Sequence, residues 1–175
     1  NTWKAKQGTE KPLLVVINTS GGGHRSATFT MAVLQELDSL SKGALMKKTF
    51  LINGASGGMI GAAYFRELYL RKMKGENINL QNKQYIDDIA GDLLNPVFTS
   101  FFARDLIAPA QKFNVGPYRY VKDRGYAFEQ KLNSNTRGFL NKQLRDYVAD
   151  EKAANAPLIF FNSVISRDGR KMIIS

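Results

Sequence analysis

The sequence predicts an α/β fold with a mostly parallel central sheet. Two short apolar runs rich in β-branched residues, LLVVIN (13–18) and TFLIN (49–53), are each followed by a glycine-rich turn and then by a segment with helical spacing. This alternation of strand, turn and helix is typical of strands that lie parallel in one sheet with helices as crossovers. With 175 residues, the chain is long enough for one domain with a sizeable core.

The first half of the chain supplies most of these elements. Residues 1–12 are polar and basic and are interpreted as a lead-in. Because residues 13–18 are continuously apolar, we expect a strand that is buried on both faces. A helix is predicted for residues 27–40, with Ser26 as its N-cap. The second strand leads through GASGG to a helix over residues 59–73, which is apolar on most sides and therefore expected to be central.

The second half breaks this rhythm. Residues 75–135 mix phenylalanine and proline with polar residues, so we expect short helices and loops that form a helical insertion or lid. A helix is predicted for residues 140–151 and a strand for residues 157–164. SRDGRKMIIS then forms a hairpin whose turn holds Asp168 and Gly169, because tight hairpin turns favour Asp-Gly. Since the chain ends directly after an apolar run, we expect it to be part of a longer protein.

Composition narrows the classes of function. The chain is 43% hydrophobic and 23% charged, which is ordinary for a soluble globular protein, and no apolar run is long enough to span a bilayer. The net charge of +10 favours anionic partners such as nucleic acid, anionic lipid headgroups or acidic ligands. No helix-turn-helix, zinc or RNP pattern supports nucleic acid. The lack of cysteine excludes disulfides and cysteine metal sites. We expect a soluble or peripheral membrane domain of unknown compartment, without cofactor or metal.

The first glycine-rich turn, SGGGHR, comprises residues 20–25. Consecutive glycines after a strand allow backbone N–H groups to point at one spot, and the N-terminus of the next helix adds to this anion site. The anion is either a phosphate, which indicates nucleotide binding, or the oxyanion of an acyl-transfer intermediate. The turn lacks the ending of a Walker loop and does not match G-x-G-x-x-G. A tight, closely packed turn without a ligand is the alternative.

The second turn places Ser56 in Gly54-Ala55-Ser56-Gly57-Gly58, which fits G-x-S-x-G. A serine in this pattern, between a strand and a helix, is a candidate nucleophile on a sharp turn. The alternative is a glycine-rich helix start that packs close to the sheet. Both turns follow strands of one parallel sheet, so both open at its carboxyl edge, where α/β sheets bind ligands. A nucleophile beside a cradle of N–H groups is the arrangement of acyl transfer.

A serine nucleophile needs a base. The chain has one histidine, His24, which precedes Ser56 and lies in the first glycine-rich turn. Nucleophile-elbow hydrolases place the histidine after the serine, so a Ser-His-Asp triad is not available. Ser-Asp, Ser-Lys or no catalysis remain. We interpret His24 as an exposed loop residue.

The two turns together resemble the patatin-like lipid acyl hydrolases, whose glycine loop reads D-G-G-G-x-R-G and whose elbow reads G-x-S-x-G. The stretches DRGYAFEQKL and FFNSVISRDGR also look family-like, so the resemblance runs from about Leu13 to the end. It implies a three-layer α/β/α sandwich and a Ser-Asp dyad. Carried over by position, Ser56 is the nucleophile and Gly21, Gly22 and Gly23 form the oxyanion hole. Arg25 braces the loop or meets a lipid phosphate, and Gly57 is assigned to substrate binding.

The chain departs from this pattern in three places. Ser20 replaces the first aspartate of the loop motif and Ser26 replaces its last glycine. The family aspartate sits in D-G-[GA], whereas the Asp-Gly pair here, at Asp168, is followed by arginine and falls in the predicted hairpin. The resemblance therefore implies the N-terminal part of a hydrolase domain, residues 13–175, whose aspartate lies outside this chain.

The implied activity is hydrolysis of a phospholipid or another lipid ester, with peripheral contact to an anionic membrane. The phenylalanine-rich residues 97–113 are expected to act as a lid, an acyl-chain wall or a membrane contact, or simply to pack as a cap. Two alternatives stay open at this point. One is a non-catalytic lipid-binding or regulatory module, and the other is a phosphate- or nucleotide-binding α/β domain.

Overall fold

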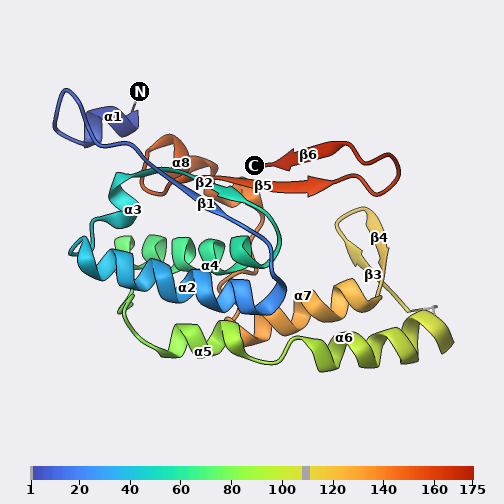
Figure 1. Ribbon diagram of the computed structural model, residues 1–175. Helices are drawn as coiled ribbons and strands as arrows, with labels where there is room; N and C mark the ends of the chain where they lie inside the picture. The colour runs from blue at the N-terminus through green and yellow to red at the C-terminus, as the bar shows by residue number, and fades with distance from the viewer. Residues whose placement is uncertain (1, 108–110) are drawn as a thin grey trace. The chain divides into compact units, whose positions relative to one another are not determined.

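The computed structural model describes residues 2–107 and 111–175 (Figure 1). The chain divides into two compact units. The larger comprises the residues up to Ala90 together with Asn141–Ser175, and the smaller comprises Gly91–Leu140. The glycine-rich turns and Ser56 all belong to the larger unit.

The larger unit is built on a four-stranded sheet with the order β1-β2-β5-β6. The first three strands run parallel, and β6 pairs antiparallel with β5. Ile17, Ile52 and Ile159 lie side by side in register across the parallel strands. The predicted α/β fold with a mostly parallel sheet is thereby confirmed. The strands are β1 (Val15–Thr19), β2 (Thr49–Gly54), β5 (Leu158–Val164) and β6 (Lys171–Ile174).

Helices α2 and α4 lie along one face of this sheet, and α5 lies beyond α2 (Figure 1). The core sits between sheet and helices, where Met31, Ile52, Phe65 and Leu68 are fully buried. On the opposite face Val16 remains 43% exposed. A complete helical layer on that second face, as in a three-layer sandwich, stays a prediction. The helices of the larger unit are α1 (Thr2–Lys6), α2 (Gly23–Leu40), α3 (Leu45–Lys48), α4 (Ser56–Met73), α5 (Gln84–Ala90), η2 (Leu144–Tyr147) and α8 (Val148–Lys152).

Three sequence predictions about these elements were wrong. Strand β1 is not buried on both faces, because its residues alternate between half-buried and exposed and one face is therefore left open to solvent. Helix α2 begins at Gly23, so Ser26 lies inside the helix and does not cap it. The predicted helix 140–151 is a 3₁₀ turn followed by the short helix α8. The lead-in also contains a helix, α1, whose Trp3 ring packs edge-on against Phe50 at 5.6 Å.

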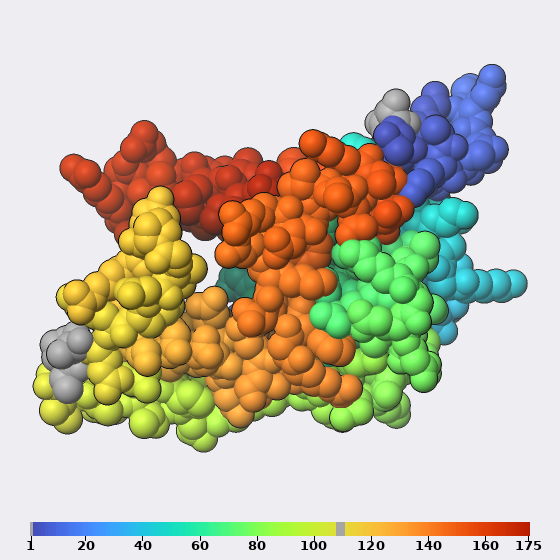
Figure 2. Space-filling model, turned by 180° about the vertical axis from the view of Figure 1, so that it is seen from behind, coloured from blue at the N-terminus to red at the C-terminus, as the bar shows by residue number. Residues whose placement is uncertain are grey.

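A buried network of charges joins α4 to the segment that returns to the sheet. The carboxylate of Glu67 is fully buried and accepts hydrogen bonds from Lys142, from Arg71 and, at 2.8 Å, from the hydroxyl of Tyr147. Arg66 donates to Glu151 and to the Pro157 carbonyl. Figure 2 shows residues 141–156, in orange, against the C-terminal half of α4, in green. These bonds hold the chain where it must enter β5 beside β2.

The smaller unit combines helices with a two-stranded ribbon. Strands β3 and β4 pair antiparallel, and the ring of Phe113 packs on Tyr126 at 4.6 Å between centroids. The predicted short helices are present, but the ribbon is not among the elements that the sequence predicted. Among the described residues, no helix combines the length and apolar content that crossing a bilayer requires. The elements are α6 (Leu94–Ser100), η1 (Phe101–Ile107), β3 (Lys112–Val115), β4 (Tyr118–Val121) and α7 (Arg124–Asn135).

Candidate active site

Ser56 occupies a sharp turn between β2 and α4. Strand β2 ends at Gly54, Ala55 is extended, and Ser56 is the first residue of the helix with φ +56°. A non-glycine residue rarely adopts this left-handed conformation, which costs of order 1 kcal/mol and recurs at functional sites. The serine is exposed at the carboxyl edge of the sheet. Backbone strain together with an exposed hydroxyl is the geometry of a nucleophile elbow.

The first glycine-rich turn lies directly against this elbow. A Cβ atom on Gly21 would lie 3.3 Å from Ser56 Cβ and 3.6 Å from Ser56 Oγ. A Cβ on Gly57 would lie 1.8 Å from the Gly23 carbonyl oxygen, and one on Gly58 would lie 2.4 Å from that of Ser20. The two turns therefore touch through their backbones, and glycine is required because no side chain fits between them.

The N-termini of two 18-residue helices meet at this contact. Helix α2 starts at Gly23 after the cap residue Gly22, and α4 starts at Ser56 after the cap residue Ala55. Neither cap residue has a side chain that can accept hydrogen bonds from the first N–H groups of its helix. Uncapped N–H groups and the positive ends of two helix dipoles favour an anion here. The arrangement can hold negative charge next to the Ser56 hydroxyl.

Two side chains hold the turns in place, Ser26, which the sequence analysis expected to be an N-cap, and Asn162, which it did not single out. Ser26 Oγ donates to the Ser20 carbonyl at 2.9 Å and so closes the first turn on itself. Asn162 on β5 donates through Nδ2 to the Gly54 carbonyl at 3.0 Å and to Asn53 Oδ1 at 2.8 Å. Asn162 was missed because only the pairing of β5 with β2 brings it beside the elbow; no sequence signal near Ser56 indicates it.

The described part of the larger unit supplies no acid or base that contacts the Ser56 hydroxyl through a hydrogen bond. Among its described residues, none hydrogen-bonds to Ser56 Oγ. The sequence analysis expected His24 to be an exposed loop residue, and this was wrong. His24 lies in the first turn of α2, and its Nε2 donates to the Ile89 carbonyl at 2.6 Å. This bond ties α2 to the end of α5.

Asp168 lies in the connection of the predicted hairpin between β5 and β6. Its carboxylate is hydrogen-bonded by the side chain and the backbone N–H of Arg170, and these bonds lower the pKa of Asp168. Gly169 takes φ +73° in the same turn. The Asp-Gly pair is thus explained by the turn, as the sequence analysis expected.

The remaining predicted site residues lie in the same region. Arg25 is exposed in the first turn of α2, and no described residue forms a hydrogen bond or ion pair with it. Its role in meeting a lipid phosphate stays a prediction. Gly57 is buried against Gly23 and serves close packing, so a direct contact of Gly57 with substrate also stays a prediction. Within the described residues, no group of three His, Cys, Asp or Glu side chains could hold a metal ion.

The strain at Ser56 can be measured. Replacing Ser56 by glycine is expected to raise the free energy of unfolding by about 0.5–1 kcal/mol relative to the alanine variant. Glycine avoids the cost of about 1–2 kcal/mol that a residue with a Cβ atom has in the left-handed conformation. It loses about 0.5–1 kcal/mol of this gain, because glycine gives up more backbone entropy on folding. Urea unfolding of the two variants gives the difference. Equal stability of the two variants would mean that the turn is not strained.

Comparison of the chain with protein-family models, with curated proteins and with solved structures found no match.

Proposed function

We propose that the chain carries the nucleophile and the oxyanion hole of a serine acyl hydrolase of the patatin type, acting on carboxylic esters of lipids. The observation that carries this proposal is the position of Ser56. It is exposed, has φ +56° and lies against Gly21 of the glycine-rich turn. A phosphate-binding loop has no need of a strained serine at this position, whereas a nucleophile elbow does.

The proposed reaction has two stages. Ser56 Oγ attacks the ester carbonyl while a base takes its proton, and the negative oxygen of the tetrahedral intermediate accepts hydrogen bonds from N–H groups of Gly21, Gly22 and Gly23. The intermediate collapses to an acyl-enzyme as the alcohol leaves with the proton. Water, activated by the same base, then attacks the acyl-enzyme and releases the acid.

The base is proposed to be an aspartate outside these 175 residues. The support is the environment of Ser56, since no carboxylate of the described larger unit hydrogen-bonds to it. Asp168 is held by Arg170, and His24 is held by Ile89. On this proposal the 175-residue chain by itself turns over esters very slowly, because an unassisted serine hydroxyl is a weak nucleophile near pH 7.

Lipid esters are the proposed substrate class. The support is the resemblance of the two turns together with the net charge of +10, which favours anionic phospholipid surfaces. Arg25, exposed next to the proposed oxyanion hole, is suited to meet a phosphate of such a lipid. Peripheral contact of the domain with an anionic membrane is part of this proposal.

A fluorophosphonate probe tests the proposed nucleophile. The complete gene product that contains this chain is incubated with the probe, and the modified peptide is identified by mass spectrometry. We expect modification at Ser56. The 175-residue chain, treated in parallel, is expected to react far more slowly because it lacks the base. Rapid modification at a different serine, with Ser56 unmodified, would overturn the proposal.

The glycine-rich turn gives a second test. In the complete gene product, Gly23→Ala is expected to lower kcat by about 10²–10³-fold with little change in KM. Gly23 has φ +59° and open space around it, so the added methyl group shifts the N–H donors without a steric clash. Gly22→Ala, where φ is +141° and the added Cβ would lie 3.0 Å from Ser26 Cβ, is also expected to displace these donors and lower kcat. Kinetics on a short-chain ester measure both variants.

Gly8→Ala is the matched control, because Gly8 has φ +68° and equally open space but lies far along the chain from the elbow. It is expected to leave kcat and KM unchanged. An equal loss of binding and of turnover in the Gly23 variant would indicate a phosphate-binding loop instead of an oxyanion hole.

A further inference from the structure

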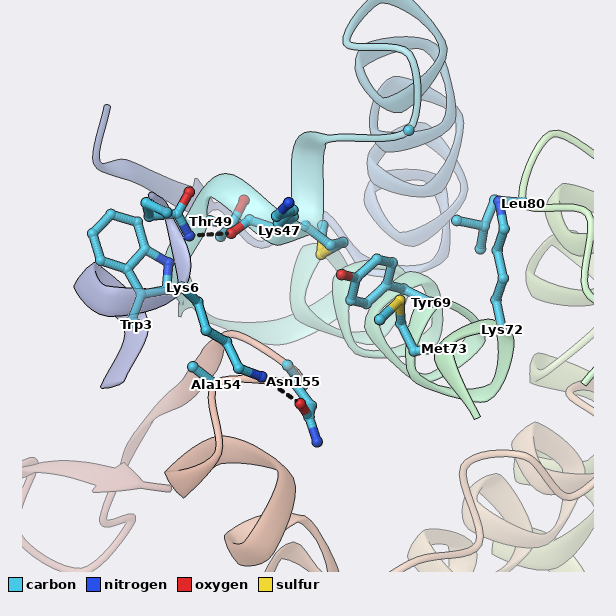
Figure 3. Close-up of a pocket in the computed structure, with 14 residues that line it drawn as sticks. Trp3, Lys6, Lys47, Thr49, Tyr69, Lys72, Met73, Leu80, Ala154 and Asn155 are labelled. Atoms are coloured by element: carbon cyan, nitrogen blue, oxygen red, sulfur yellow. Dashed lines mark hydrogen bonds between the residues drawn. The ribbon is translucent and has the colours of Figure 1, made fainter. Parts of the chain in front are cut away.

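A hollow lies at the opposite end of α4 from Ser56. It has a volume of about 360 Å³, within the range of small-molecule pockets, and every residue that lines it belongs to the larger unit. Its walls come from α1, from α3, from the last turns of α4 and from residues 154–156 (Figure 3). Tyr69 lies thirteen positions after Ser56 in α4, which corresponds to about 20 Å along the helix axis. The hollow is therefore not part of the candidate active site.

The walls of this hollow are mainly apolar. Trp3, Met46, Tyr69 and Leu80 supply most of the apolar lining. All four residues are buried, with exposed fractions of 9% or less. Met73 at the end of α4 is 59% exposed and extends the apolar wall toward solvent. A hydrocarbon chain placed here would leave water for a largely apolar surface.

Tyr69 contributes a hydroxyl donor to these walls. Tyr69 is 7% exposed, yet no described residue hydrogen-bonds to its hydroxyl. Figure 3 shows that hydroxyl pointing away from α4 toward the side of Trp3 and Lys47. Burial, helped by the nearby charge of Asp38, raises the pKa of Tyr69, so the hydroxyl remains a hydrogen-bond donor at neutral pH. The hydroxyl is therefore open to accept a partner from the hollow, either water or a ligand.

The charged side chains that line the hollow are all positive. Lys6, Lys47 and Lys72 line it, and no aspartate or glutamate is among the lining residues. Lys6 donates to the side chain of Asn155 at 2.6 Å, while all three lysines are exposed. Their charges favour an anion at the opening, against the opposing charge of nearby Asp38 and the negative end of the α4 dipole.

We propose that this hollow binds a single fatty carboxylate. Its carboxylate accepts a hydrogen bond from the Tyr69 hydroxyl under the field of the three lysines, and its alkyl chain lies along Trp3, Met46 and Met73. Apolar walls, one hydroxyl without a protein acceptor and three lining lysines together match an amphiphilic anion and no neutral polar ligand. The binding does not depend on whether Ser56 hydrolyses esters.

Trp3 makes the proposal directly testable, because it is the single tryptophan of the chain and lines the hollow. The 175-residue chain is titrated with monomeric sodium decanoate while tryptophan fluorescence is followed. We expect a saturable change. Decanol, which has the same chain without the charge, is expected to bind at least about tenfold more weakly, since hydrogen bonds to charged groups contribute about that factor. No saturable change with decanoate, or equal affinity for decanol, would overturn the proposal.

Tyr69→Phe removes only the hydroxyl and is expected to raise the Kd for decanoate about tenfold. Tyr118→Phe is the matched control, because Tyr118 is 67% exposed on β4, and it is expected to leave the Kd unchanged. Circular dichroism checks that both variants are folded.

The Lys47→Gln, Lys72→Gln double variant alters only exposed side chains and is expected to raise the Kd and to reduce its salt dependence. An unchanged Kd in this double variant would count against the proposal even if the Tyr69 variant did not fold.

Discussion

Replacing Ser56 by alanine in the complete gene product is expected to lower kcat/KM for a short-chain ester by at least about 10³-fold, because on the proposed mechanism Ser56 forms the acyl-enzyme. The substitution removes one exposed oxygen atom and leaves the backbone and Cβ in place. No described residue hydrogen-bonds to that oxygen, so the free energy of unfolding should change by less than about 0.5 kcal/mol. Loss of activity with retained stability is therefore the expected signature.

Ser166→Ala is the matched control, since Ser166 is also an exposed turn serine but lies in the connection between β5 and β6. It is expected to keep full activity. Steady-state kinetics on a p-nitrophenyl ester and urea unfolding measure the two properties in both variants. If the Ser56 variant retains most of the activity, Ser56 is not the nucleophile and the proposed function is wrong.

The second large effect is expected for Gly57→Ala. The single added methyl group should lower the free energy of unfolding by about 3 kcal/mol or more. A Cβ at this position would lie 1.8 Å from the Gly23 oxygen and 2.7 Å from its carbonyl carbon. Both are backbone atoms, so no side-chain rotation can relieve the clash. Either the N-termini of α2 and α4 move apart, or the turn after β2 unfolds locally.

Gly169→Ala separates the clash from backbone strain. Gly169 has φ +73°, but nothing lies within 4 Å of an added Cβ there, so its cost should be limited to about 1 kcal/mol. Urea unfolding of the 175-residue chain compares the two variants without any assumption about activity. A Gly57 variant that is no less stable than the Gly169 variant would mean that the two glycine-rich turns do not pack against each other as described.

Local patterns in the sequence were sufficient for the elements around the site. The strand, turn and helix at residues 49–73 were predicted because a short apolar run, a glycine cluster and helical spacing follow one another directly. The hairpin at Asp168 was predicted because its turn dipeptide has a strong conformational preference of its own. Ser56 and Gly21–Gly23 were singled out in the same way. Each of these signals depends on neighbours in the chain, which a single sequence displays.

Tertiary structure alone decided what surrounds those elements. Whether both faces of β1 are buried depends on what packs over each face of the sheet, and its apolar run does not reveal that. The bonds from His24 to Ile89 and from Asn162 to Gly54 join residues 65 and 108 positions apart. The unpaired hydroxyl of Tyr69 is notable only because α1 and α3 build a hollow in front of it. Such contacts are set by how strands and helices pack, and packing leaves no local pattern from which they could be predicted.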